Sequence, residues 1–350
     1  MRRVVTQSLA ARPMRLRAEI ERWPLTAPFR ITGYAWEFIE VLLVSLEADG
    51  LVGRGEAAGI YYKNDTPASM LRQIESLRPG IEAGIDRDAL QCLLPSGGTR
   101  NALDCALWDL EAKIGGIPVW ETAQVGKPRA VLTTFTCGAD DPQKMAWSAL
   151  GYRNARAIKL KLTGEPIDAE RVSAVRDSRK DVWLAVDANQ GFTRASLERL
   201  MPSLVESRVS LIEQPFPVGQ EALLDGFESP IPIAADESVQ GLADIRQLVG
   251  RFQTVNIKLD KCGGLTEALA MARTAQTLGL NAMVGNMMGT SLAMAPAFLV
   301  GQLCTVVDLD GPALLKADRS QTVQYEEGLV MCPETLWGGA DSPAPSADRR

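Results

Sequence analysis

The chain has 350 residues, which is long for one ordinary domain and suits a barrel of about 200–250 residues joined to a smaller module. Its hydrophobic share of 46% and charged share of 23% are typical of a globular protein, and its apolar runs are all shorter than the roughly 20 residues of a transmembrane helix. With a net charge of −6 and scattered basic residues, neither nucleic acid nor a membrane is indicated as a partner. The first 13 residues lack the apolar stretch of a secretory signal, so we expect a cytoplasmic protein.

The sequence contains no histidine, and this absence narrows the chemistry. It excludes Ser-His and Cys-His nucleophile systems, removes the commonest general base near neutral pH, and removes the commonest zinc ligand. Acid–base chemistry must then fall to Lys, Glu, Asp, Tyr or Cys. The six cysteines lie far apart without a Cys-x-x-Cys pair, which is typical of free thiols in a reducing compartment.

The N-terminal part of the sequence predicts an α+β module. Residues 14–60 have the pattern of antiparallel strands, and the Ala-Asp-Gly tripeptide at 48–50 is a hairpin signal between two apolar runs. Residues 67–125 change to helical periodicity, which includes a Gly-Gly stop. We therefore place a first domain at residues 1–125.

From about residue 130, eight short apolar runs alternate with amphipathic helical stretches. Alternating β and α elements imply a parallel sheet, and eight units favour a closed (β/α)8-type barrel over residues 126–319. The alternative is an open doubly wound sheet, but no Gly-x-Gly-x-x-Gly motif follows any of the runs. Residues 320–340 read as a segment that returns to cover the first domain, and we expect the Pro- and Ser-rich tail after them to be disordered.

Charged residues follow most of these apolar runs directly, at the ends where a barrel carries its active site. Asp187, Glu213 and Asp236 follow three consecutive strands, one βα unit apart. Three carboxylates this close repel one another and would hold a proton or a cation, and oxygen ligands alone favour Mg²⁺, or else Mn²⁺. The alternative is that each carboxylate pairs with a lysine or caps a helix. Their occurrence on three consecutive strands favours a metal site.

Lysines flank the three acids in the predicted barrel. In Ala-Ile-Lys-Leu-Lys, Lys159 and Lys161 lie on one face of a strand, and Lys258 ends the strand on the other side of the acids. Two such lysines on opposite faces of one carbon could remove a proton from one side and return it from the other. We expect Lys159, as a second positive charge, to lower the pKa of Lys161. Ordinary ion pairing would explain one lysine, but not this flanking pair.

This order of lysines and acids along consecutive strands resembles that of the enolase superfamily, and more narrowly that of its muconate lactonizing enzyme subgroup. That resemblance implies a modified (β/α)8 barrel with an N-terminal α+β capping domain closed by the C-terminal segment. The motif Asp308-Leu309-Asp310 at the end of the eighth strand is similar to that of the dipeptide epimerases. The family pattern implies Asp187, Glu213 and Asp236 as Mg²⁺ ligands, and Lys161 and Lys258 as the paired acid and base.

The resemblance also implies a reaction and a substrate. Asp308 and Asp310 would bind the α-ammonium of a dipeptide whose C-terminal Cα is inverted by 1,1-proton transfer through an enediolate. Asn286 stands where a Cys is expected in this branch. Two loops of the capping domain would fold over the barrel mouth, with the specificity candidates Tyr34, Trp36, Tyr61, Tyr62 and Lys63.

Three other functions are possible for a barrel with these site residues. An o-succinylbenzoate synthase or muconate-type cycloisomerase shares the lysines and the metal, but the Asp-x-Asp motif argues against both because their substrates carry no ammonium there. An N-succinylamino-acid racemase is disfavoured for the same reason. A barrel retained only for binding would have lost one of the five core groups, and none is lost. The sequence leaves open whether the protein is a monomer or a homo-oligomer.

Overall fold

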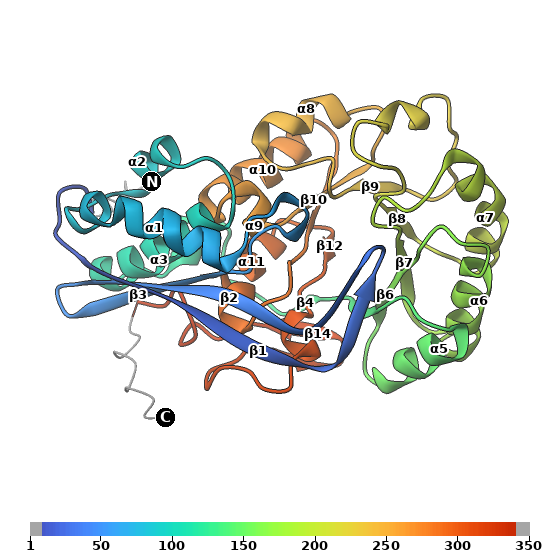
Figure 1. The fold of residues 1–350 in the computed structure, drawn as a ribbon, viewed down its shortest axis with the longest axis horizontal. Coiled ribbons are helices and arrows are strands. Elements are labelled where there is room, and N and C mark those ends of the chain that lie inside the picture. The colour runs from blue at the N-terminus through green and yellow to red at the C-terminus, as the bar shows by residue number, and fades with distance from the viewer. Residues whose placement is uncertain (1–8, 341–350) are drawn as a thin grey trace.

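The computed structural model describes residues 9–340, so the predicted disordered tail lies outside the described residues (Figure 1). A capping region lies beside a curled sheet that is covered on its outside by helices. We call the capping region the cap; it runs from the first strand to the fourth helix. We call the curled sheet with its helices the barrel. None of the helices between residues 9 and 340 has the length and apolar composition that crossing a bilayer requires.

The cap begins with a three-stranded antiparallel sheet, as predicted. The turn between its second and third strands is Asp49-Gly50, both with positive φ (53° and 75°), the backbone that short hairpins favour. Four helices follow the strands, the first of which begins with a capping box at Thr66. The cap elements are β1 (Arg15–Ile31), β2 (Tyr34–Ala48), β3 (Leu51–Ala57), α1 (Pro67–Glu82), α2 (Arg87–Leu93), α3 (Gly98–Gly115) and α4 (Val119–Thr122).

Helix α3 lies unusually close to β3, and two glycines allow this approach. A Cβ at Gly53 would lie 2.2 Å from the carbonyl oxygen of Ala106, and one at Gly55 would lie 2.0 Å from that of Ala102. The far side of α3 packs into the barrel core through Cys105 and other buried residues. Helix α3 therefore packs against both the cap sheet and the barrel core and connects the two regions.

The barrel contains eight parallel strands whose spatial order follows their order along the chain. The sheet curls so that its two edges meet, where the Thr134 N–H donates to the carbonyl of Val307 at 2.9 Å. This confirms the predicted fold class, a (β/α)8-type barrel with an N-terminal capping region. The strands are β5 (Phe135–Cys137), β6 (Ala157–Lys161), β7 (Trp183–Asp187), β8 (Leu211–Glu213), β9 (Ile233–Ala235), β10 (Thr254–Ile257), β11 (Asn281–Val284) and β12 (Val306–Val307).

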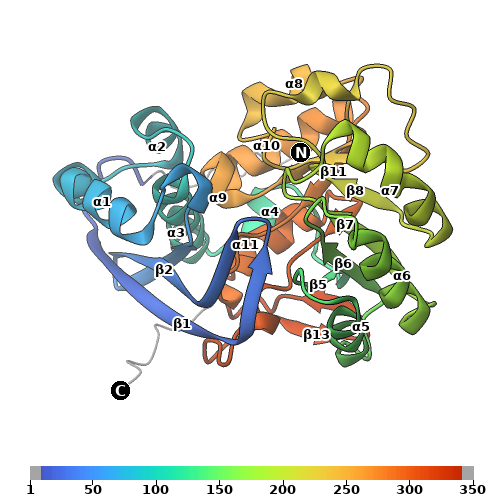
Figure 2. The same cartoon turned by 45° about the vertical axis from the view of Figure 1, so that its right-hand side comes forward.

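Helices on the outside of the sheet connect successive strands (Figures 1 and 2), except that only a short 3-10 helix (Glu221–Leu224) lies between β8 and β9. Thr193 opens one of them with a capping box, in which its side chain accepts from the Ser196 N–H. The helices are α5 (Pro142–Gly151), α6 (Asp168–Ser178), α7 (Arg194–Glu206), α8 (Ile245–Leu248), α9 (Leu259–Cys262), α10 (Leu265–Thr277) and α11 (Ser291–Gly301).

The C-terminal segment contacts both regions. Strand β4 (Val131–Leu132) pairs with β14 (Leu329–Met331), which pairs with β13 (Gln324–Glu326). Farther along, the Trp337 indole donates to the carbonyl of Arg54 at 2.9 Å, and the Gly338 N–H donates to Asp109 at 2.8 Å. The segment thus leaves the barrel and binds the cap.

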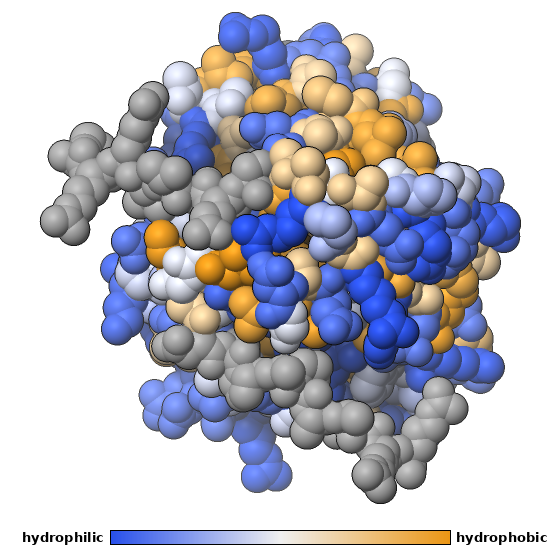
Figure 3. Space-filling model, turned by 90° about the vertical axis from the view of Figure 1, so that its left-hand side faces the viewer, coloured by the Kyte–Doolittle hydropathy of each residue, from blue (hydrophilic) through white to orange (hydrophobic). Residues whose placement is uncertain are grey.

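The tip of the β1–β2 hairpin lies over the carboxyl ends of the barrel strands (Figure 2). The Thr32 hydroxyl lies 3.1 Å from the carbonyl oxygen of Leu162 and 3.2 Å from that of Ala188, just beyond β6 and β7. On the cap-side face of the molecule, hydrophilic and hydrophobic side chains are interspersed (Figure 3). The hairpin places cap residues directly above the predicted site.

Candidate active site

Three buried carboxylates lie together at the carboxyl ends of β7, β8 and β9. Asp187 and Glu213 are paired in the register of β7 and β8, and Asp236 follows β9. One carboxylate oxygen from each lies within 4.8 Å of those of the other two, and at most 2% of each residue is exposed. Burial, and then the charge of Asp187, raises the pKa of Glu213 to about 7. The sequence-predicted trio is therefore brought together in space.

The donor set of this trio fits a hard divalent cation. Among residues 9–340, Glu213 Oε2 is buried without a hydrogen-bond partner, as is Oδ1 of the neighbouring Asn256. Six buried carboxylates against four ammonium groups around the site leave a formal charge of −2, which one divalent cation would balance. The groups counted are Asp187, Glu213, Asp236, Glu237, Asp308 and Asp310 against Lys159, Lys161, Lys258 and Lys261.

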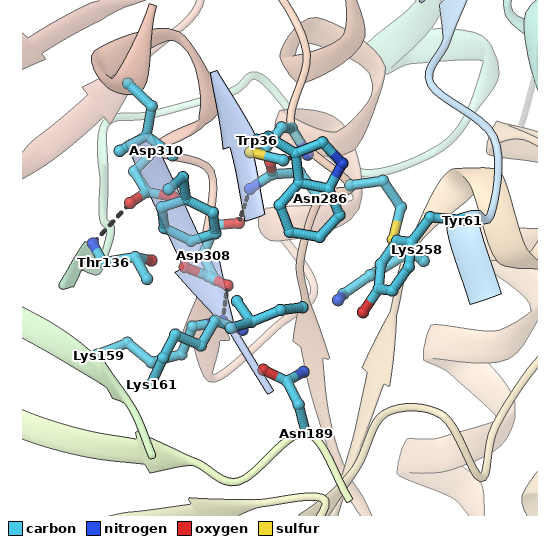
Figure 4. A pocket seen from close by; sticks show the side chains of 15 residues that line it. Trp36, Tyr61, Thr136, Lys159, Lys161, Asn189, Lys258, Asn286, Asp308 and Asp310 are labelled. Carbon is cyan, nitrogen blue, oxygen red and sulfur yellow. Dashed lines mark hydrogen bonds and ion pairs between the residues drawn. The ribbon is translucent and has the colours of Figure 1, made fainter. Parts of the chain in front are cut away.

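The two flanking lysines point into the pocket from opposite sides (Figure 4), and each pairs with one acid of the trio. Lys161 Nζ at the end of β6 lies 2.5 Å from Asp187 Oδ2, and Lys258 Nζ after β10 lies 2.8 Å from Asp236 Oδ2. Burial alone would lower the pKa of Lys258, but facing carboxylates, Asp236 first, hold it well above its ordinary value. A cation bound to the trio would compete with the lysines for the carboxylates and oppose that shift.

Lys159 makes contacts that the strand pattern does not indicate. It forms an ion pair with Asp308, and its Nζ lies 3.5 Å from Glu213 Oε2. Although burial disfavours its charge, these carboxylates raise its pKa above the ordinary value. Its positive charge is thus compensated by Asp308, which follows the eighth strand of the barrel.

The Asp-x-Asp pair follows β12 and lines the same pocket. Asp308 accepts a hydrogen bond from the Thr134 hydroxyl and pairs with Lys159, while Asp310 accepts the Thr136 N–H at 2.6 Å (Figure 4). Burial, and then the charge of Asp308, raises the pKa of Asp310 to about 6. Because Lys159 compensates Asp308, Asp310 retains a charge available to a cationic ligand group.

The five cap candidates do not lie equally close to the pocket. Trp36 and Tyr61 line it, with ring centroids 5.2 Å apart. Tyr34 stacks on Trp36 at 5.6 Å and is 44% exposed, and Tyr62 accepts a hydrogen bond from the Gln240 amide at 3.0 Å. Lys63 is exposed and is not a lining residue.

Several residues of the site do not lie at strand ends and were not predicted from the sequence. Lys261 is buried and donates to Asp236 Oδ1 at 2.5 Å, from the helical turn that follows Lys258. Met287 and Met288 line the pocket beside Asn286, whose amide donates to the carbonyl of Asp308 at 2.7 Å. The spacing of three between Lys258 and Lys261 is a signal that could have indicated the first of these.

Comparison with known proteins places this geometry in a family. Residues 14–122 match the mandelate racemase / muconate lactonizing enzyme N-terminal domain, and residues 143–336 match the enolase C-terminal domain-like family. The chain is 39% identical to L-Ala-D/L-Glu epimerase of Escherichia coli (strain K12) over 88% of this chain and 96% of that protein. It is 42% identical to N-acetyl-D-glutamate racemase of a Pseudoalteromonas species, over 71% of this chain and 78% of that one.

A solved structure from Agrobacterium tumefaciens, an enolase family member with homology to dipeptide epimerases, has bound sodium and L-Ala-L-Glu. It superposes with a TM-score of 0.90 at 38% identity, covering 93% of this chain and all of that one. Two further solved dipeptide epimerases are complexed with Mg and a dipeptide. The chain therefore belongs to the enolase superfamily and is an isomerase. Within that superfamily it groups with the dipeptide epimerases.

Proposed function

We propose that the protein is a Mg²⁺-dependent dipeptide epimerase that inverts the Cα of the C-terminal residue of an L,L-dipeptide. The observation that carries this proposal is the arrangement of two buried lysines, Lys161 and Lys258, on either side of three carboxylates within 4.8 Å of one another. The names of the similar proteins support the same substrate class.

The lysines would perform the proton transfer. One of them accepts the Cα proton from one face of the substrate, and the other, arriving protonated, returns a proton to the opposite face. Asp187, Glu213 and Asp236 would hold Mg²⁺, or Mn²⁺ in its place. When bound, the metal stabilises the negative charge that develops on the substrate carboxylate as the proton leaves. The cap hairpin and Tyr61 cover the pocket and limit access of water to the exposed carbon.

Asp308 and Asp310 would orient the other end of the substrate. Asp310 keeps a carboxylate that no lysine or arginine pairs with among residues 9–340, and an α-ammonium is a suitable ligand for it. Binding the ammonium there and the carboxylate at the metal would leave the C-terminal Cα between the two lysines.

The test is incubation in D₂O with Mg²⁺ and a set of L,L-dipeptides, followed by mass spectrometry and chiral analysis. We expect deuterium at the Cα of the C-terminal residue, together with inversion. Formation of o-succinylbenzoate from its precursor without any dipeptide exchange would contradict the proposal.

An N-acylamino-acid racemase is a second candidate, because a relative with 42% identity is an N-acetyl-D-glutamate racemase. Such substrates have an acyl group where a dipeptide has its ammonium-bearing residue. N-acetyl and N-succinyl amino acids in the same D₂O assay distinguish the two functions.

A further inference from the structure

The direction of the inverted residue's side chain follows from the positions of the proposed reacting groups, and this step rests on the proposed function. Once the proton has left, Cα is planar, with Lys161 and Lys258 on its two faces. Its three remaining substituents lie in the plane between them. The carboxylate is directed to the acid trio and the nitrogen toward Asp308 and Asp310, so the side chain takes the third direction, toward the cap.

The wall in that direction is apolar. Trp36 and Tyr61 from the cap and Met287 and Met288 from the loop after β11 line the pocket (Figure 4). Among residues 9–340 the pocket lining includes no arginine, and its lysines are the three at strand ends already described. A carboxylate side chain in this position would be buried without a partner, which is strongly unfavourable.

The two cap cations closest in sequence to the lining residues of the cap, Arg30 and Lys63, are not themselves lining residues. Phe29 and Ile31 line the pocket, so the alternation along β1 directs Arg30 to the other face of the strand. There Arg30 lies 3.7 Å from Asp140. Lys63 is exposed and does not contribute to the lining. Neither side chain lines the pocket in which an acidic group of the substrate would lie.

A second cavity of about 580 Å³ lies behind this wall. The same four side chains line both cavities and thus form a partition, and its two methionines are flexible enough to accommodate bulk. The charged residues of the second cavity are three carboxylates and one guanidinium, so its field disfavours an anion. These residues are Glu37, Glu40, Asp65 and Arg30.

We propose that the residue inverted by this enzyme has an apolar side chain, of the size of Leu, Met or Phe, that packs against Trp36, Tyr61, Met287 and Met288. The substrate class of this chain would then differ from the Glu named for its Escherichia coli relative. The partition would discriminate between substrates in two ways. A charged side chain would be buried there without a partner, whereas an apolar side chain would gain contact area against it.

The first test measures kcat/KM for L-Ala-L-Leu, L-Ala-L-Met, L-Ala-L-Phe, L-Ala-L-Glu and L-Ala-L-Lys with Mg²⁺ present, and for N-acetyl-L-Leu and N-acetyl-L-Glu. We expect the apolar members to exceed both charged ones by at least about tenfold. Equal or higher kcat/KM for Glu or Lys overturns the inference. If only the N-acetyl series reacts, the epimerase proposal fails, and the ratio of Leu to Glu in that series still decides the side-chain class.

The second test places a cation in the partition. Trp36→Arg should raise the ratio of kcat/KM for L-Ala-L-Glu to that for L-Ala-L-Leu at least about tenfold. The matched control is Trp147→Arg on α5, where the residue is 62% exposed and is not a lining residue of the pocket; it should leave the ratio unchanged. An unchanged ratio in Trp36→Arg, with native circular dichroism and Mg²⁺ affinity, would overturn the placement of the side chain.

Discussion

The floor of the pocket and its mouth are built from different kinds of contact. On the floor, charged side chains at strand ends bind one another, as in the pairs of Lys161 with Asp187 and Lys258 with Asp236. At the mouth, aromatic rings pack on one another, with Tyr34 and Tyr61 centroids 4.6 Å apart. Ion pairs hold individual charged atoms in position, whereas packed rings hold the shape of an apolar surface. The floor is thus suited to chemistry and the mouth to selection, and the two should respond differently to substitution.

The largest expected effect is on the floor. Lys161→Ala and Lys258→Ala should each reduce epimerisation by roughly 10³-fold, because each removes one of the two proton carriers. Starting separately from the L,L and L,D isomers in D₂O, each variant should lose Cα exchange from one isomer. Full exchange from both isomers in either variant would contradict the two-base assignment.

The next effect concerns a floor residue that holds the metal site indirectly. Lys261→Met removes an ammonium that lies outside the pocket lining and orients Asp236 from the helical turn after β10, so we expect Mg²⁺ affinity to fall about 10- to 100-fold in calorimetric titration. Lys113→Met is the matched control, since Lys113 is a buried lysine paired with Asp109 in the cap. The control should lower the free energy of unfolding and leave Mg²⁺ affinity unchanged. Equal Mg²⁺ affinities for the two variants would remove Lys261 from this positioning role.

A smaller effect tests the end of the floor near β12. Asp310→Asn should raise the dipeptide KM about tenfold, because a charge-assisted contact is lost, while Mg²⁺ affinity stays the same. The folded pKa of Asp310 is raised to about 6, so its carboxylate gains a proton as the pH falls through that value. The wild-type KM should therefore rise below pH 6, and the variant should lack this step. The same pH step in Asp310→Asn would assign it to another group.

The smallest effect is expected at the mouth. Tyr62→Phe removes the hydroxyl that accepts from Gln240, but Gln240 also donates to the carbonyl of Glu237 at 2.8 Å. The ring packing of Tyr62 on Tyr61 is retained. We expect KM to change by no more than about threefold and kcat to stay unchanged. A large loss of kcat would show that the mouth also positions the reacting groups.

The same contrast explains what the sequence could predict. Parallel strands in consecutive order bring their carboxyl ends together, so Asp187, Glu213 and Asp236 could be placed from spacing alone. The ion pair of Lys159 with Asp308 could not, because it joins the second and eighth strands across the barrel interior. Lys261 depends on a single helical turn after β10, whose geometry the strand pattern does not contain.

The mouth was less predictable for a physical reason. Trp36 lies near the start of β2, Tyr61 in a short 3-10 helix (Tyr61–Lys63) after β3, and Met288 in the loop after β11, and contacts between these distant segments set their positions. Loop conformation depends on such packing more than on local periodicity. The aromatic character of the cap loops could be predicted, but the sequence could not tell that Trp36 and Tyr61 face inward while Lys63 faces solvent.

The C-terminal segment bears on how specificity could be transferred between relatives. Because Trp337 and Gly338 bind β3 and α3 of the cap while β14 pairs with β4, the packing of the cap on the barrel depends on both the N-terminal and the C-terminal segments. On the proposed division into residues 1–125, 126–319 and 320–340, a chimera that exchanges the N-terminal part alone would join mismatched surfaces. To transfer a new substrate preference, the N-terminal part and the C-terminal segment would have to be exchanged together, although they are encoded by separate stretches of the gene.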